Sequence, residues 1–282
     1  MHSHCGVTKF VGINLHRNIY QGKTAVVLLC IAVFLQAYFG DLRTVLAAKD
    51  EALGAGELFL AITNNNYTSF MIWTGFILLI SDLPNMDKSV FPFLLRSNKL
   101  SWLKGQIMYL MCITMIYYFY LILLVILLLV PHISFSADWT TVIFKMINAP
   151  LSYGVRGRFV LPVSVLRNQK AVLLFLKGSV LFVLAGFSMG MITMTLNLLW
   201  NRGPGILAGG LELVFDFWVT TVMYNHQEMI YVSPLSMARI GNISGSQWNE
   251  MLPTFSYAVM FHCILIIVSY TIQILNIRRM EL

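Results

Sequence analysis

The sequence is poor in charged residues and in cysteine for its length. Of 282 residues, 11% are charged and 58% are hydrophobic, and the mean hydropathy is +0.74. Because soluble domains carry about a quarter charged residues, this composition excludes an ordinary soluble domain and predicts a polytopic membrane protein. Cys5, Cys30, Cys112 and Cys263 stand singly, so the spacing predicts neither a disulfide framework nor a cysteine-based metal site.

Acidic residues are scarcer than basic ones, and the formal net charge is +7. A charge of this sign suits either nucleic acid or a membrane surface. The basic residues fall in short loops between apolar runs and do not form one continuous stripe. This distribution is typical of membrane proteins and argues against nucleic-acid binding.

Long apolar runs dominate the sequence, and six of them approach the roughly 20 residues that a helix needs to cross a bilayer. They cover residues 24–42, 67–83, 106–130, 171–199, 204–224 and 257–275. None alternates between polar and apolar residues as a barrel strand does. We therefore predict an all-α polytopic membrane protein in which one domain, residues 1–282, contains six transmembrane helices.

Lys and Arg in the loops predict that both termini are cytoplasmic. With that orientation the cytoplasmic segments hold ten basic residues and the outer segments hold eight, five of them in the loop at 132–170. The loop at 132–170 can fold on itself, because Asp138 can cap a helix with Val142, Ile143, Met146 and Ile147 on one side. The cytoplasmic ten are Lys9, Arg17, Lys23, Lys88, Arg96, Lys99, Lys104, Arg202, Arg278 and Arg279.

A polar stretch between the second and third runs extends from Ser81 to Gln106. Ser89 is a suitable N-cap for a short helix that ends near Ser97 and lies flat under the bilayer. Ser101 can cap the next helix, with Trp102 at headgroup level. The stretch is predicted to form a stiff basic elbow suited to receiving force from a partner.

The predicted outer loop between the fifth and sixth runs contains Ser233-Pro234 and several glycines. We expect it to re-enter the membrane as short helices. Two triplets, Asn66-Tyr67-Thr68 and Asn242-Ile243-Ser244, match the N-glycosylation pattern on the predicted outer side.

Ser188 lies in a Gly-x-Ser-x-Gly pattern in the fourth run, and His262 lies in the sixth. An intramembrane serine protease, like the rhomboid family, pairs a serine and a histidine from these two spans. However, Ser188 is predicted to be in the middle of a helix and not on a sharp turn. The favoured interpretation is that Gly186 and Gly190 form a small-residue helix-packing face.

Glu212 and Asp216 are four residues apart, so both carboxylates face the same side of the fifth run. Unpaired carboxylates in a membrane are costly. On the predicted topology, Lys177 and Asp216 lie about 9 Å and about 13 Å below the outer helix ends. We expect Lys177 to pair with Asp216, or the two carboxylates to serve ion coupling in a stand-alone carrier.

Gly22-Lys23-Thr24 matches the end of a phosphate-binding loop, but Arg17 stands where that loop requires its first glycine. No strand precedes the triplet. The sequence thus predicts no nucleotide site and no cofactor in this chain, and any ATP must be bound by another subunit.

Three segments together resemble the first cytoplasmic loop of small bacterial ABC-2-type transporter permeases. They are Ile80-Ser81-Asp82-Leu83-Pro84-Asn85-Met86-Asp87, Leu95-Arg96-Ser97-Asn98-Lys99 and Trp102-Leu103-Lys104-Gly105-Gln106-Ile107. The six spans and Ser233-Pro234 are similar to that family as well. The motif likeness covers about 30 residues, and the loop at 132–170 is longer and more basic than in the simplest members.

The resemblance implies a permease subunit of an ABC exporter in the cell membrane. Residues 87–99 would be a coupling helix seated in a separate ATP-binding cassette subunit, which binds ATP and Mg²⁺. A second permease chain, identical or related, would complete the complex. The residues expected to set the elbow and contact the ATPase are Asp82, Asp87, Arg96, Lys99 and Trp102.

Overall fold

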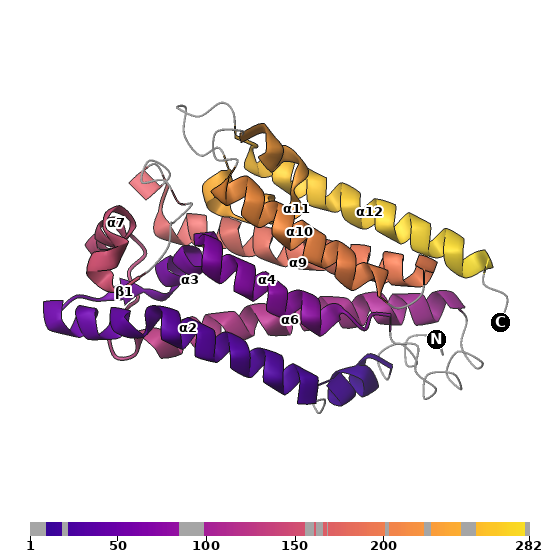
Figure 1. Ribbon diagram of the computed structural model, residues 1–282, viewed down its shortest axis with the longest axis horizontal. Helices are drawn as coiled ribbons and strands as arrows, with labels where there is room; N and C mark the ends of the chain where they lie inside the picture. The colour runs from indigo at the N-terminus through magenta and orange to yellow at the C-terminus, as the bar shows by residue number, and fades with distance from the viewer. Residues whose placement is uncertain are drawn as a thin grey trace.

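The structure, a computed structural model, is almost entirely helical over the residues that it describes (Figure 1). The one strand pairing in this part of the chain is parallel and joins β1 (Leu53–Gly54) to β2 (Ile133–Ser134). The residues described are 10–18, 22–84, 99–155, 161, 166–167, 169–200, 203–222, 227–243 and 252–279.

A long helix occupies each of the six predicted apolar runs, and the helices lie side by side along the long axis of the molecule (Figure 1). Consecutive helices alternate in direction, so α2 begins and α12 ends at one end of the bundle, here called the Lys23 end. The opposite end is called the α7 end. The six are α2 (Gly22–Lys49), α4 (Asn66–Ile80), α6 (Lys99–Leu129), α9 (Ala171–Trp200), α10 (Pro204–Thr221) and α12 (Phe255–Arg279).

Among the described helices, α2, α6, α9 and α12 are long and apolar enough to cross a membrane. The protein is therefore an all-α membrane protein, and its described residues include four such helices. Helix α4 has 15 residues, about 22 Å, and α10 has 18 residues that include two carboxylates. Six spans and the orientation stay predictions.

Helix α4 follows a break in the chain that the sequence pattern did not indicate. Helix α3 (Ala55–Asn64) ends at Asn65, whose extended backbone starts α4. The Asn65 side-chain oxygen accepts hydrogen bonds from the backbone N–H groups of Tyr67 (3.1 Å) and Thr68 (3.3 Å). Asparagine is a strong N-cap residue, so Asn65 separates α3 from α4 just before the apolar run predicted at residues 67–83.

Short helices are present before α12 where they were predicted. They are η2 (Gln227–Val232), α11 (Pro234–Met237) and η3 (Ile240–Asn242). Gly178 lies seven residues, or about 10 Å, into α9, and a Cβ atom added there would lie 3.8 Å from the Cβ atom of Ile240 in η3. Helices α11 and η3 thus pack against the side of α9. Their re-entry into a membrane stays a prediction.

The loop at 132–170 contains α7 (Thr141–Asn148) and η1 (Pro150–Tyr153). Val142, Ile143 and Met146 are buried, as predicted, but the N-cap is Thr140 and not Asp138. Both carboxylate oxygens of Glu57 accept bonds of 2.5 Å from Thr140, one from its N–H and one from its hydroxyl. This buried carboxylate fixes the start of α7 to α3.

Glycines allow α9 to approach its neighbours closely. A Cβ atom at Gly186 would lie 3.1 Å from Thr114 of α6, and one at Gly190 would lie 2.3 Å from a methyl group of Leu110. Gly205 is more restrictive, because its Cβ would lie 2.5 Å from the backbone oxygen of Thr193. A backbone atom cannot rotate away as a methyl group can, so Gly205 sets the spacing of α9 and α10.

We predict that Gly205→Ala lowers the free energy of unfolding by about 1–3 kcal/mol, because α10 must shift away from α9. Gly210→Ala on the same helix is the control, since no atom lies within 4 Å of its added Cβ. The control gains helix propensity and should be neutral or stabilising by up to about 1 kcal/mol. Thermal unfolding of the detergent-solubilised protein measures both, and equal melting temperatures would contradict the prediction.

Candidate functional site

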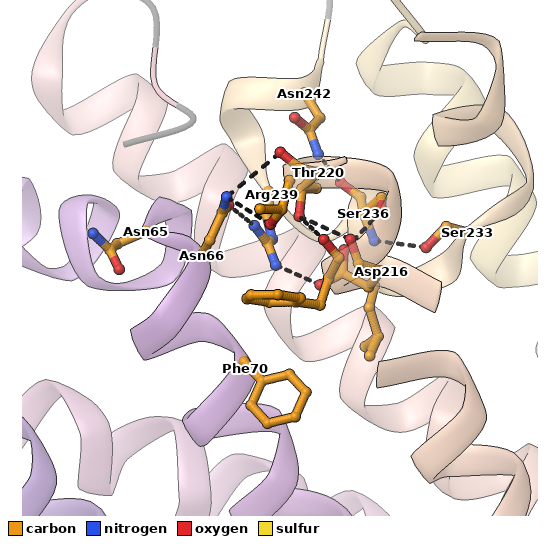
Figure 2. Close-up of polar contacts among 12 residues, drawn as sticks. Asn65, Asn66, Phe70, Asp216, Thr220, Ser233, Ser236, Arg239 and Asn242 are labelled. Atoms are coloured by element: carbon orange, nitrogen blue, oxygen red, sulfur yellow. Dashed lines mark hydrogen bonds and ion pairs between the residues drawn. The ribbon is translucent and has the colours of Figure 1, made fainter. Parts of the chain in front are cut away.

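A buried ion pair lies near the α7 end of the bundle, between α10 and the segment that joins α11 to η3. Nη2 of Arg239 pairs with Oδ2 of Asp216, and the two side chains are 1% and 0% exposed (Figure 2). Nη1 of Arg239 donates to Oδ1 of Asn66, the first residue of α4, at 2.6 Å. One guanidinium therefore joins α4, α10 and the short helices.

Further hydrogen bonds surround this ion pair (Figure 2). The second oxygen of Asp216 accepts from the Ser236 hydroxyl at 2.7 Å. Nδ2 of Asn66 donates to the hydroxyl of Thr221 at 3.3 Å, and Nδ2 of Asn242 donates to the Ser236 backbone oxygen at 2.8 Å. We call Asn66, Asp216, Ser236, Arg239 and Asn242 the Arg239 cluster.

Glu212, one turn before Asp216, also faces the short helices. Its Oε1 accepts from the Ser233 hydroxyl at 2.9 Å and from the Leu235 N–H at 3.2 Å. Both predicted carboxylates thus hold α11 against α10. A cation bound by them would have to displace these donors, which gives the ion-coupled carrier no support. The described residues contain no group of three or more His, Cys, Asp or Glu side chains placed to hold a metal ion.

The predicted pairing of Lys177 with Asp216 is wrong. Nζ of Lys177 donates to Oε1 of Gln169 at 2.9 Å and lies over the ring of Phe255, while Asp216 pairs with Arg239. The prediction rested on the similar distances of Lys177 and Asp216 from the outer ends of their helices. Such distances do not determine which faces of the two helices meet. Arg239 was counted as an outer-loop cation, and the apolar residues around it were the only sign of burial.

Both predicted glycosylation triplets place their asparagine in the interior. Asn66 and Asn242 are 4% and 3% exposed, and both side-chain amides donate hydrogen bonds in the interior, to Thr221 and to Ser236 respectively. A glycan needs an accessible amide nitrogen. In this fold neither asparagine can carry a glycan, because both amides are buried. The triplet pattern itself contains no information on burial.

Ser188 and His262 meet between α9 and α12. Ser188 Oγ and His262 Nδ1 are 3.0 Å apart, and neither side chain has exposed surface. The serine hydroxyl also donates to the Ala185 backbone oxygen at 3.0 Å. Since the hydroxyl has one proton, both contacts are satisfied when the imidazole N–H donates to the serine, the reverse of the direction that activates a nucleophile. The geometry is that of a buried hydrogen bond between helices.

At the Lys23 end, the exit of α4 is fixed by polar contacts. Nζ of Lys23 pairs with Oδ2 of Asp82 at 2.7 Å and donates to Oγ of Ser81 at 2.6 Å. Asn197 of α9 donates to the backbone oxygens of Ser81 (3.1 Å) and Leu83 (2.6 Å). The α4 exit is thereby joined to α2 and to α9.

The predicted coupling residues are only partly within this arrangement. Asp82 lies at the exit of α4 and Lys99 begins α6, whereas Asp87 and Arg96 lie outside the described residues. Trp102 is 2% exposed and packs in the hydrophobic core of the bundle, so in this conformation its side chain is not on the surface for the predicted contact with an ATPase. Its position at headgroup level stays a prediction.

We predict that Asp216→Ala and Arg239→Ala each cost about 3–5 kcal/mol of stability, because each leaves one buried charge unpaired. The double variant should cost less than the sum of the two, since no lone charge remains. Thermal unfolding in detergent measures all three. Lys145→Ala is the control, because it removes a 2.6 Å pair with Glu51 whose lysine is 56% exposed and which contributes about 1 kcal/mol or less. Additive losses would contradict a direct pair.

We predict that a fluorophosphonate probe does not label the purified protein, because Ser188 is inaccessible and hydrogen-bonded to a backbone oxygen. A soluble serine hydrolase added to the same sample confirms that the probe is active. Labelling that disappears in Ser188→Ala would overturn this prediction and restore the protease interpretation.

Comparison of the chain with protein families, with curated proteins and with solved structures finds no match. Two arrangements of the described residues bear on function: the buried Arg239 cluster near the α7 end and the fixed exit of α4 at the Lys23 end.

Proposed function

We propose that this chain is the permease subunit of an ATP-binding cassette exporter, with a separate subunit binding ATP and Mg²⁺. A second permease chain, identical or related, completes the complex in the cell membrane. The Lys23 end and both termini face the cytoplasm. The proposal rests on the four membrane-suited helices, on the sequence resemblance around residues 80–107, and above all on the contacts of Asn197.

The Asn197 side chain supports coupling because it holds three segments at once. Its amide nitrogen donates to the backbone oxygens of Ser81 and Leu83 at the exit of α4. Its amide oxygen accepts from the backbone N–H groups of Gly203 (3.3 Å) and Gly205 (2.9 Å) at the start of α10. A single buried side chain thus fastens α4 to both α9 and α10.

Lys23 extends this connection to α2 through Ser81 and Asp82. Residues 81–84 lead directly into the segment 85–98, which the sequence predicts to contain the coupling helix. Displacement of that segment by an ATPase would be transmitted through these hydrogen bonds to α2, α4, α9 and α10. A carrier powered by an ion gradient does not require that the start of the loop between α4 and α6 be bonded to α2, α9 and α10 in this way.

We predict that Arg96→Glu combined with Lys99→Glu abolishes the stimulation of ATP hydrolysis by the permease while the chain remains inserted. The reason is that a basic surface facing the ATPase becomes acidic. The experiment isolates the full chain with its co-purifying ATPase in mild detergent, reconstitutes the complex in liposomes and measures ATP hydrolysis with and without the permease.

The matched control is Arg43→Glu combined with Lys170→Glu, which reverses two exposed cations near the α7 end and should leave hydrolysis unchanged. Asn197→Ala is a second variant: the ATPase should stay bound while stimulation falls severalfold, because the α4 exit is no longer fastened to α10. Full stimulation in both test variants, or isolation of an active transporter with no ATP-hydrolysing companion, would contradict the proposed function.

A further inference from the structure

Helix α2 carries a glutamine on its outer face. Gln36 lies about 20 Å from Lys23 and about 8 Å from Asp41 along the helix axis, with only uncharged residues between these two. It is therefore on the hydrocarbon side of the charged residues at both ends of the helix. Its side chain is exposed and has no hydrogen-bond partner among the described residues.

The other carboxamides in the six long helices are buried or bonded to a neighbouring element. They are Asn66, Gln106, Asn197, Gln273 and Asn276. A polar group in hydrocarbon is costly unless it is hydrogen-bonded, because no water is present to replace the missing partner. Within these helices Gln36 is thus the exception, and only a group outside this chain can bond its amide.

Gln36 belongs to a regular stripe on the face of α2 that points away from the bundle. Leu29, Val33, Gln36 and Gly40 are separated by four, three and four residues, the spacing at which two helices pack along a common seam. Leu29 and Val33 are 65% and 60% exposed. A Cβ atom added at Gly40 would lie 3.6 Å from Nε2 of Gln36, so the amide lies beside a residue that lets a second helix approach closely.

Helix α12, at the opposite edge of the bundle from α2, has a different exposed face (Figure 1). Its large exposed side chains are apolar and include Ile264, Ile267 and Val268. Thr271 is exposed as well, but its hydroxyl donates to the Ile267 backbone oxygen at 2.9 Å, within its own helix. Lipid tails satisfy such a face, whereas they offer Gln36 neither a donor nor an acceptor.

A second copy of α2 supplies what Gln36 lacks. A carboxamide has both donors and an acceptor, so two copies of Gln36 can bond to each other across a two-fold axis. Two copies of one membrane chain have the same orientation, and an axis along the bilayer normal therefore brings each residue of the stripe against its own equivalent.

We propose that α2 binds α2 of a second copy of this chain along Leu29, Val33, Gln36 and Gly40, with the two Gln36 amides bonded at the centre of the contact. This contact rests on the proposed function, which requires a second permease chain. It makes that chain identical and not merely related, and it places the contact on α2 and not on α12.

Cysteine cross-linking of the full chain in native membranes tests where the copies meet. In a chain whose four cysteines are replaced by alanine, Val33→Cys should give a disulfide-linked dimer on mild oxidation with copper phenanthroline. Ile267→Cys is the matched control, because residue 267 is 62% exposed on α12 and should give no dimer. A dimer linked at residue 267 and none at residue 33 would overturn the proposal.

Energy transfer between labelled full chains in liposomes measures the dissociation constant of the dimer as the chains are diluted with lipid. Gln36→Leu should raise this constant about 3- to 30-fold, the contribution of one hydrogen bond between membrane helices. Gln36→Asn should retain part of the association, because an amide remains. Thr271→Leu, which removes an exposed hydroxyl from α12, should have no effect.

The melting temperature of Gln36→Leu in detergent should not fall, because Gln36 has no bond within its own chain to lose. Equal dissociation constants for the wild-type chain and Gln36→Leu, or a monomer at every dilution, would overturn the proposal. These measurements are separate from the proposed function. A dimer linked at residue 33 that binds no ATPase supports this contact and counts against the permease, whereas stimulated ATP hydrolysis without that link does the reverse.

Discussion

The fold depends on one constraint: a charge removed from water must meet its counter-charge inside the protein. Arg239 and Asp216 satisfy this constraint with exposed fractions of 1% and 0%. Desolvation of two such ions costs several kcal/mol each, and hydrogen bonds to their other donors and acceptors help to offset that cost. The hydroxyl of Ser236 and the amide oxygen of Asn66 supply two such bonds, whereas Nε of Arg239 has no hydrogen-bond partner among the described residues. Because Arg239 contacts both Asn66 and Asp216, the break before α4 and the short helices before α12 are parts of one arrangement.

The two ends of the bundle are held together differently, and the difference bears on where movement is possible. Within the Arg239 cluster the ion pair is buried and charge-neutral, and removal of either partner leaves an uncompensated charge. At the Lys23 end the ion pair of Lys23 with Asp82 is partly exposed, so water can replace either partner at little cost. The fixed connection at that end is the neutral amide of Asn197. In the proposed permease, a partner acting at the Lys23 end therefore moves a helix exit that is joined to its neighbours but is not held by buried charge.

The helices were predictable because a long apolar run has few alternatives in a membrane, where each backbone group must be bonded within its own segment. The common face of Glu212 and Asp216 was predictable from their spacing, because four residues make about one helical turn. Their partners were not, because Arg239 and Ser233 come from a loop whose path depends on tertiary packing. The contact of Ser188 with His262 shows the same limit: sequence spacing named both residues, but only the packing of α9 on α12 decides their distance and their burial. Asn65 illustrates a local signal that the prediction from apolar runs did not use, because an asparagine in front of such a run is a strong candidate for an N-cap.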